Sequence, residues 1–236
     1  MIGVLINVGA IILGSALGCL IGKGFSRRVR EAVMSASAIC VVVIGISGAL
    51  KTSDITITII SVVLGALLGG LIGIEKHLDS LGEYAQKRLA GNSEGSGFAN
   101  GFVTATLVFC VGAMAIVGSL DSGIRGDNST LIAKSVLDGV CAMIFAGSMG
   151  IGVMLSALAV LAYQGAIALL GQLIAPIFTQ ELIAEMSAAG GIMIIGVGLN
   201  LLQIRKEKIP VGDMLPGIFM PALVLPVYNW ISSLVG

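Results

Sequence analysis

The chain has 236 residues, of which 56% are hydrophobic and 11% charged, and its mean hydropathy is +1.05. A soluble domain carries about 25% charged residues and still exposes roughly a quarter or more of its surface, so this composition excludes a soluble enzyme and a disordered chain. The 13 basic and 13 acidic residues cancel, which gives no case for a nucleic-acid partner. The composition predicts an all-α protein that crosses a lipid bilayer several times.

Charge-free apolar runs mark the expected spans, because one crossing needs about 20 apolar residues. The 42 residues from 139 to 180 carry no charge and are long enough for two spans, so we expect a turn near 147–152. The sequence therefore predicts one transmembrane domain, 1–236, of about eight spans: 2–22, 32–50, 55–74, 98–120, 131–148, 151–174, 186–204 and 211–235.

The distribution of positive charge predicts the orientation of these spans. With both termini outside, ten of the 13 Lys and Arg residues fall in cytoplasmic loops, in agreement with the positive-inside rule. The longest of these loops, 75–97, has Leu78, Leu81 and Leu89 on one helical face and so predicts an amphipathic helix at the membrane surface.

Similar stretches recur along the chain. GSALGCLIG (14–22) returns as GALLGGLIG (65–73), and glycines at every fourth position let helices approach closely. Two further similarities join spans that run in opposite directions, which is the pattern of the inverted repeats in many secondary transporters. A chain rich in Gly, Ala and Ile also produces such matches by composition. The two pairs are 112–120 with 191–199 and 34–48 with 186–199.

Two aspartates are candidates for an intramembrane site, because carboxylates within a bilayer are costly and often functional. Asp138 lies six residues after a plausible helix start at Ile132, about 9 Å into the outer half of its span. Pairing with Lys134 at i, i+4 is the structural alternative. Asp213 enters the last span from the cytoplasmic side and can equally be a first-turn acid favoured by the helix dipole.

Prolines interrupt the last expected span. An interior proline removes a backbone hydrogen bond, so we expect this segment to be kinked or unwound around Pro216 and Gly217 or at Pro221. Asn200 and Gln203 close the preceding span and could supply carbonyl oxygens to an ion, or cap and bridge helices. The candidate binding residues are thus Asp138, Asp213, Asn200, Gln203, Pro216 and Gly217.

Longer stretches carry a family resemblance: GVLINVGAIILGSALGCLIGK, KSVLDGV with GIGVMLSA, YQG, MSAAGGIMIIGVGLNLL and LPGIFMPAL. Together they resemble a family of bacterial inner-membrane proteins catalogued as domain of unknown function 554, the YqgA/YdfK-like proteins. The resemblance covers essentially the whole chain. It implies a multi-pass protein of the plasma membrane for which transport has been suggested, and it brings no established substrate or site residues.

The sequence favours a secondary transporter of a small solute or ion, coupled to H⁺ or Na⁺, whose partners are the bilayer, the solute and the coupling ion. Glycine-lined helices are also compatible with a homo-oligomer. The alternatives are a passive channel and a non-transporting scaffold or sensor. No catalytic residues, metal ligands or cofactor motifs are expected, and we expect no enzyme activity.

Overall fold

The computed structural model describes residues 1–77, 80, 97–204 and 207–235, and every regular element in those ranges is helical. This confirms the predicted all-α membrane bundle. The expected amphipathic helix over 75–97 lies largely outside the described residues. The elements are α1 (Ile2–Gly22), α2 (Arg27–Ala49), α3 (Ile55–Ile72), α5 (Gly97–Cys110), α6 (Ala113–Ile124), α7 (Ser129–Met149), α8 (Gly152–Ile174), α9 (Gln180–Leu201), the 3₁₀ helix η1 (Gly212–Ile218) and α10 (Pro221–Val235).

Capping residues fix several helix ends. Ser26, Asp54 and Thr179 each accept a hydrogen bond from a backbone N–H in the first turn of α2, α3 and α9 respectively. The turn expected at 147–152 is present, because α7 ends at Met149 and Gly150 follows with φ 83°. Residues with a side chain rarely adopt this backbone conformation, so a glycine at this position allows the chain to turn between α7 and α8.

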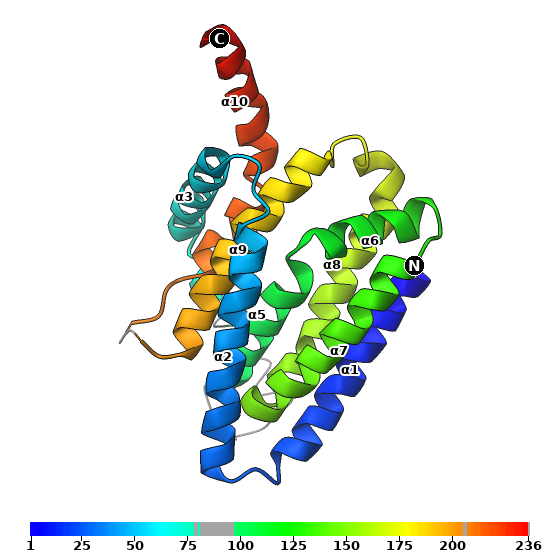
Figure 1. Cartoon of the computed structure of the whole chain (residues 1–236), viewed down its shortest axis with the longest axis vertical. Coiled ribbons are helices and arrows are strands. Elements are labelled where there is room, and N and C mark those ends of the chain that lie inside the picture. Colours follow the sequence, from blue (N-terminus) through cyan, green and yellow to red (C-terminus); the bar gives the residue numbers. More distant parts are fainter. Residues whose placement is uncertain (78–79, 81–96, 205–206, 236) are drawn as a thin grey trace.

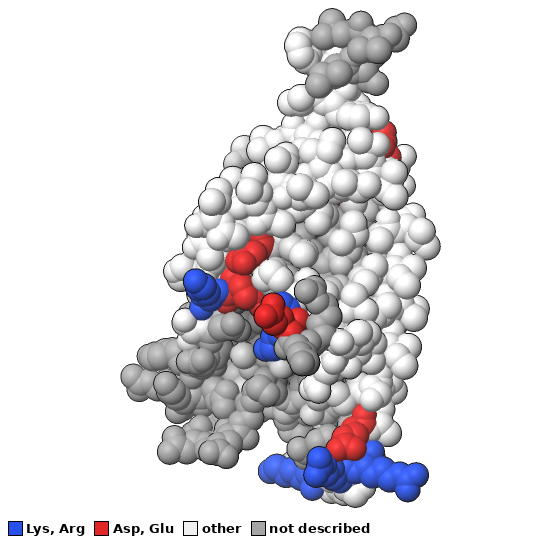
Figure 2. All heavy atoms as spheres, turned by 90° about the vertical axis from the view of Figure 1, so that its left-hand side faces the viewer, with Lys and Arg blue, Asp and Glu red and all other residues white. Residues whose placement is uncertain are grey.

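Six helices within the described ranges are long and apolar enough to cross a membrane, and a seventh span results if α5 and α6 count as one. Their outer faces carry exposed apolar side chains such as Leu13, Leu71 and Leu173, as contact with lipid tails requires. The face in Figure 2 has broad areas without charge; most of its charged side chains lie from the middle downward, and one acidic side chain lies near the top.

Two expected spans are interrupted rather than continuous. The segment predicted at 98–120 bends by 62° between α5 and α6. The segment predicted at 211–235 consists of the seven-residue η1 and the 15-residue α10, in agreement with the expected break around Pro216 and Pro221. Neither piece reaches the length of a span, so eight crossings remain a prediction.

Glycines lie at the contacts of two neighbouring helix pairs, α1 with α7 and α2 with α9 (Figure 1). Gly14 and Gly18 of α1 pack on Gly139 and Met143 of α7, and because the residue numbers rise together, the two helices are parallel. In α2 and α9, by contrast, Gly45 lies on Ile195 and Gly48 on Ser187 and Gly191, so these helices are antiparallel. An inverted repeat of 34–48 and 186–199 requires this antiparallel arrangement, and the repeat itself stays a prediction.

The remaining contacts place α9 at the centre of the molecule. Its most apolar stretch is 78% buried, against 22–44% for the other five single-helix spans. Met193 and Ile194 of α9 belong to the same buried cluster as Phe109 of α5 and Phe145 of α7. The helix α3 packs on η1, α5 and α6 pack on α8, and α10 projects beyond the other helices (Figure 1).

Candidate functional site

A buried ion pair occupies the middle of α7. Lys134 Nζ donates to Asp138 Oδ2 at 2.6 Å, and both side chains are only 8% exposed. Asp138 is the tenth of the 21 residues of α7, about 14 Å from the first at 1.5 Å per residue. The helix therefore begins three residues before the expected start at Ile132, and the depth of Asp138 in the bilayer stays a prediction.

Amide side chains from two other helices extend this pair into a network. Asn7 of α1 donates through Nδ2 to Asp138 Oδ2 at 3.0 Å and to Gln164 Oε1 of α8 at 3.2 Å. Asn7 and Gln164 have no exposed surface, and Asn7 Oδ1 and Gln164 Nε2 have no hydrogen-bond partner within the described part of the chain. The network therefore joins three helices and keeps unused hydrogen-bonding capacity inside the bundle.

Glycines bring α1 close enough for Asn7 to reach α7. A Cβ atom on Gly14 would overlap the carbonyl oxygen of Gly139, and one on Gly18 would overlap that of Met143. A larger residue at either position would push the two backbones apart. The glycine motif of 14–22 thus serves the polar network as well as packing.

The bend between α5 and α6 interrupts the fourth apolar segment of the chain and lines the same cavity as Asp138 of α7. Val111 and Gly112 separate the two helices, and Gly112 adopts φ 125° and ψ 151° as the N-cap of α6, without a side-chain capping bond. This backbone conformation favours glycine. As at the start of any α-helix, the N–H groups of Ala113 and Met114 have no acceptor within α6.

A cavity of about 470 Å³ connects the bend with the ion pair. Lys134 and Asp138 line it from α7, Gly112 and Met114 from the bend, and Ser187 from α9. Residues of α2, among them Val43 and Ser47, complete its wall. A mostly apolar cavity with a few polar groups is the usual form of a small-molecule site.

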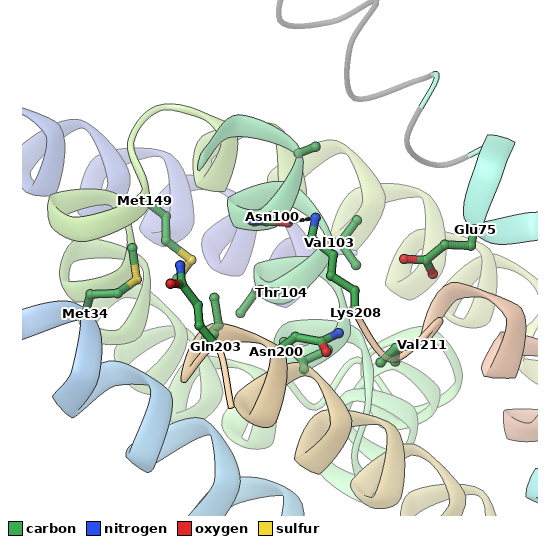
Figure 3. A pocket seen from close by; sticks show the side chains of 13 residues that line it. Met34, Glu75, Asn100, Val103, Thr104, Met149, Asn200, Gln203, Lys208 and Val211 are labelled. Atoms are coloured by element: carbon green, nitrogen blue, oxygen red, sulfur yellow. Dashed lines mark hydrogen bonds between the residues drawn. The ribbon is translucent and has the colours of Figure 1, made fainter. Parts of the chain in front are cut away.

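Asn200 and Gln203, which the sequence assigns to the same site as Asp138, line a different and smaller cavity of about 150 Å³ (Figure 3). Asn200 accepts from the N–H of Ile209 at 2.8 Å and donates to its carbonyl oxygen at 2.9 Å. It thereby fixes the chain after α9, as in the capping alternative. Gln203 has φ 54°, and Lys208 on the same wall donates to Asn100 at 3.0 Å.

Three predicted residues belong to η1 and pack against α3: Asp213, Pro216 and Gly217. None of them lines either of the two cavities described above. Asp213 Oδ1 accepts from the N–H of Glu75 at 2.8 Å, and Glu75 Oε2 accepts from the N–H of Gly212 at 2.5 Å. These reciprocal bonds fasten the end of α3 to the start of η1. The structure thus places the six predicted residues in three locations, with only Asp138 in the larger cavity.

Glu185 is a second buried acid among the described residues, beside Asp138, and sequence reasoning missed it. It has no exposed surface, and its carboxylate accepts from the Thr52 and Thr58 hydroxyls and from the N–H groups of Ser53 and Asp54, at 2.6–3.1 Å. The carboxylate therefore caps the N-terminus of α3 from α9. A signal was available, because Glu185 lies beside a long apolar run, but it falls one residue before the expected span of 186–204.

The fold and the cavity define a polytopic helical membrane protein with an ionisable pair inside the bundle. The chain belongs to the family described as "Protein of unknown function (DUF554)", whose profile matches residues 2–226. It is 31% identical to the "Uncharacterized membrane protein YdfK" of Bacillus subtilis over 97% of both chains. It is 33% identical to the "Uncharacterized protein YqgA" of Escherichia coli over 93% of this chain and 94% of that one. No solved structure was found to match this chain.

Proposed function

We propose that this protein is a secondary transporter that moves a small solute or ion by alternating access, coupled to H⁺ or Na⁺. The cavity that contains Lys134 and Asp138 beside the α5–α6 bend is the observation that carries the proposal. Ionisable groups inside membrane helices commonly mark substrate or ion pathways, and discontinuous helices commonly form the binding site of a transporter.

Asp138 is the proposed coupling group. As a carboxylate it accepts from Lys134 and Asn7, and protonation would remove the charge that holds the Lys134 ammonium group at 2.6 Å. A released Lys134 could then interact with a solute in the cavity. Loading of a proton and binding of the solute would thus be coupled through one pair of side chains.

The bend between α5 and α6 is the proposed moving element. Gly112 has a backbone conformation that residues other than glycine rarely adopt, and a Cβ atom there would meet nothing within 4 Å. A change of angle at Val111 and Gly112 would move α6 relative to the cavity wall without breaking a packed contact of Gly112. Hinges of this kind absorb conformational change in a few residues.

The test uses purified protein in proteoliposomes that contain a pH-sensitive dye. A panel of small carboxylates, amino acids, amines, sugars and Na⁺ is added outside, and solute-driven movement of protons is recorded. We expect a signal for at least one class, which Asp138→Asn abolishes. Asp121→Asn is the matched control, because Asp121 also has a basic i, i+4 neighbour, Arg125, at 3.5 Å but lies at the end of α6.

Three results would overturn the proposal. No signal across the whole panel would remove proton-coupled transport, and normal uptake by Asp138→Asn would remove Asp138 from coupling. Solute flux that never runs against a gradient in either direction would identify a passive channel instead.

We further propose that the protein resides in the plasma membrane with both termini outside. The connection from the end of α1 into the first turn of α2 carries Lys23, Arg27 and Arg28, and such clusters remain on the cytoplasmic side. Labelling of single cysteines placed at Ser26 and at Thr52 tests the orientation. We expect a membrane-impermeant maleimide to modify only the second position in intact cells, and modification of only the first would reverse the topology.

A further inference from the structure

Hydrogen-bond donors without acceptors surround the larger cavity. Ser187 lines it from α9, is 1% exposed, and its hydroxyl has no partner among the described residues. Lys134 carries three N–H donors, of which one has a described acceptor, Asp138 Oδ2. Because buried polar groups are normally paired, donors that line a cavity can be satisfied by a partner that enters it from outside the chain.

The first turn of α6 contributes further donors. Ala113, Met114 and Ala115 line the same cavity, and Ala115 donates within the turn to Gly112 at 3.0 Å. The N–H groups that precede it in α6 have no acceptor in their own helix and form the positive end of the helix dipole. Oxygen atoms of an anion satisfy such groups in many proteins.

Close packing of α9 on the bend brings Ser187 and α6 to one cavity. A Cβ atom on Gly190 would overlap the side chain of Val111, and one on Gly191 would overlap the backbone of Ala49 in α2. These two glycines therefore let α9 lie against both walls. Ser187 stands one helical turn before them and lines the same cavity as Met114 and Lys134.

The formal charge of the cavity is positive. Lys51 and Lys134 line it together with one acid, Asp138, which leaves +1. The rest of its wall is mainly apolar, as at Val43, Ile44, Val111, Leu137 and Ile194. A single negative charge and a short hydrocarbon body match these two features.

We propose that the ligand of this cavity is a small monocarboxylate with an apolar body. Its carboxylate accepts from Lys134, from the Ser187 hydroxyl and from the first N–H groups of α6, and its hydrocarbon part lies against α2 and α9. This assignment rests on the transport function proposed above, since it names the substrate class of the same site.

Isothermal titration of the intact protein in detergent with 3-methylbutanoate tests the assignment. The isosteric 3-methylbutanamide and 3-methylbutylamine are the ligand controls, and we expect only the carboxylate to bind. Ser187→Ala should raise its Kd about tenfold, the usual effect of losing one hydrogen bond to a charged group. Ser61→Ala, which removes another buried hydroxyl without a described partner but from α3, should leave the Kd unchanged.

The ligand comparison on the unmodified protein keeps the test independent of any folding defect. Binding of the amide or the amine as tightly as the carboxylate would overturn the assignment, and so would equal Kd values for Ser187→Ala and Ser61→Ala. Carboxylate binding without any solute-driven flux would leave the ligand assignment intact and remove the transport function. Proton-coupled uptake of an amine or a sugar, with no carboxylate binding, would support the transport function and remove the ligand assignment.

Discussion

In two regions of the molecule a helix packs through the same glycine motif on a segment that contains an aspartate, but the aspartate is neutralised or hydrogen-bonded in different ways. In the first, α1 packs through Gly14 and Gly18 on α7, and Asp138 is neutralised by Lys134 inside the bundle. In the second, α3 packs through Gly65 and Gly69 on η1, and Asp213 accepts from a backbone N–H. A carboxylate at mid-helix needs a counter-ion because the backbone there is already paired, whereas one at a helix end can use free N–H groups.

The difference gives the two aspartates different capacities. Asp138 belongs to a network of side chains that borders a cavity, so a change in its charge alters the interactions of Lys134 and Asn7. Asp213 and Glu75 form reciprocal bonds to fixed backbone groups. The first arrangement suits a group that changes state, and the second suits a fastening between helices.

The largest expected effect follows from removal of the counter-ion in the first region. Lys134→Met leaves a buried carboxylate unpaired and should destabilise the fold by about 3–5 kcal/mol. The measurement is reversible unfolding in detergent at neutral pH. Lys134→Met combined with Asp138→Leu should restore most of the loss, and a double variant as unstable as the single one would show that the cost is one of packing.

Valine in place of a ridge glycine tests whether the two glycine contacts are equivalent. Gly14→Val and Gly65→Val each introduce side chains that overlap a facing backbone, and each should cost about 1–3 kcal/mol or more. Gly9→Val and Gly70→Val, on the same helices, are the controls because a Cβ atom there would meet nothing within 4 Å. Loss of stability in the controls as well would mean that helix propensity, rather than the contact, is responsible.

A smaller effect is expected from neutralising the acid of the second region. Asp213→Asn keeps a carbonyl oxygen for the Glu75 N–H and should cost about 1 kcal/mol, because only the charge assistance is lost. Asp213→Ala removes the acceptor and should cost more in the same unfolding assay. If Asp213→Asn instead matches Lys134→Met in its effect, the contrast between the two regions is wrong.

The smallest effect concerns the acids that precede α7 and α3. The backbone N–H of Ser129 lowers the pKa of Asp127, while the hydroxyl of Tyr228 and then the N–H of Thr56 lower the pKa of Asp54. A lowered pKa in the folded state means that the stabilisation is complete above the ordinary pKa and is lost as the pH falls through the folded value.

Amide hydrogen exchange from pH 7 to pH 3 measures this effect. After correction for the intrinsic exchange rate, protection of the Ser129 and Thr56 amides should fall slightly towards the acidic end. Asp127→Asn should make the protection at Ser129 independent of pH without changing Thr56. An unchanged pH dependence at Ser129 in that variant would assign the effect to another group.

The sequence predicted the spans well where charge and capping define them. The helices α1 and α3 begin at the expected residues, because an apolar run starts directly after Met1 and after the cap Asp54. The bend at Val111 and Gly112 escaped prediction because no proline or charge marks it. The contact between Val111 and Gly190 of α9 accompanies the bend, and such a tertiary contact cannot be seen in local sequence.

The candidate site was only partly predictable for a related reason. Asp138 stands out because a carboxylate within an apolar run is costly. Its partner Asn7 is 131 residues away, and Gln164 comes from a third helix. Asp213 and Asn200 lie on either side of the charged loop between the last two predicted spans, and both bind backbone groups near the junction of α9, η1 and α3 rather than a ligand in the larger cavity.

The parallel pairing of α1 with α7 has a consequence for the biogenesis of the protein. Asn7 leaves the ribosome 131 residues before Asp138, a delay of roughly 7–26 s at ordinary rates of synthesis. Throughout that interval the glycine face of α1 and its amide have no α7 to pack on. The nascent α1 must therefore wait in the insertion machinery or in lipid, and chains terminated before residue 129 should be rapid substrates for membrane proteases.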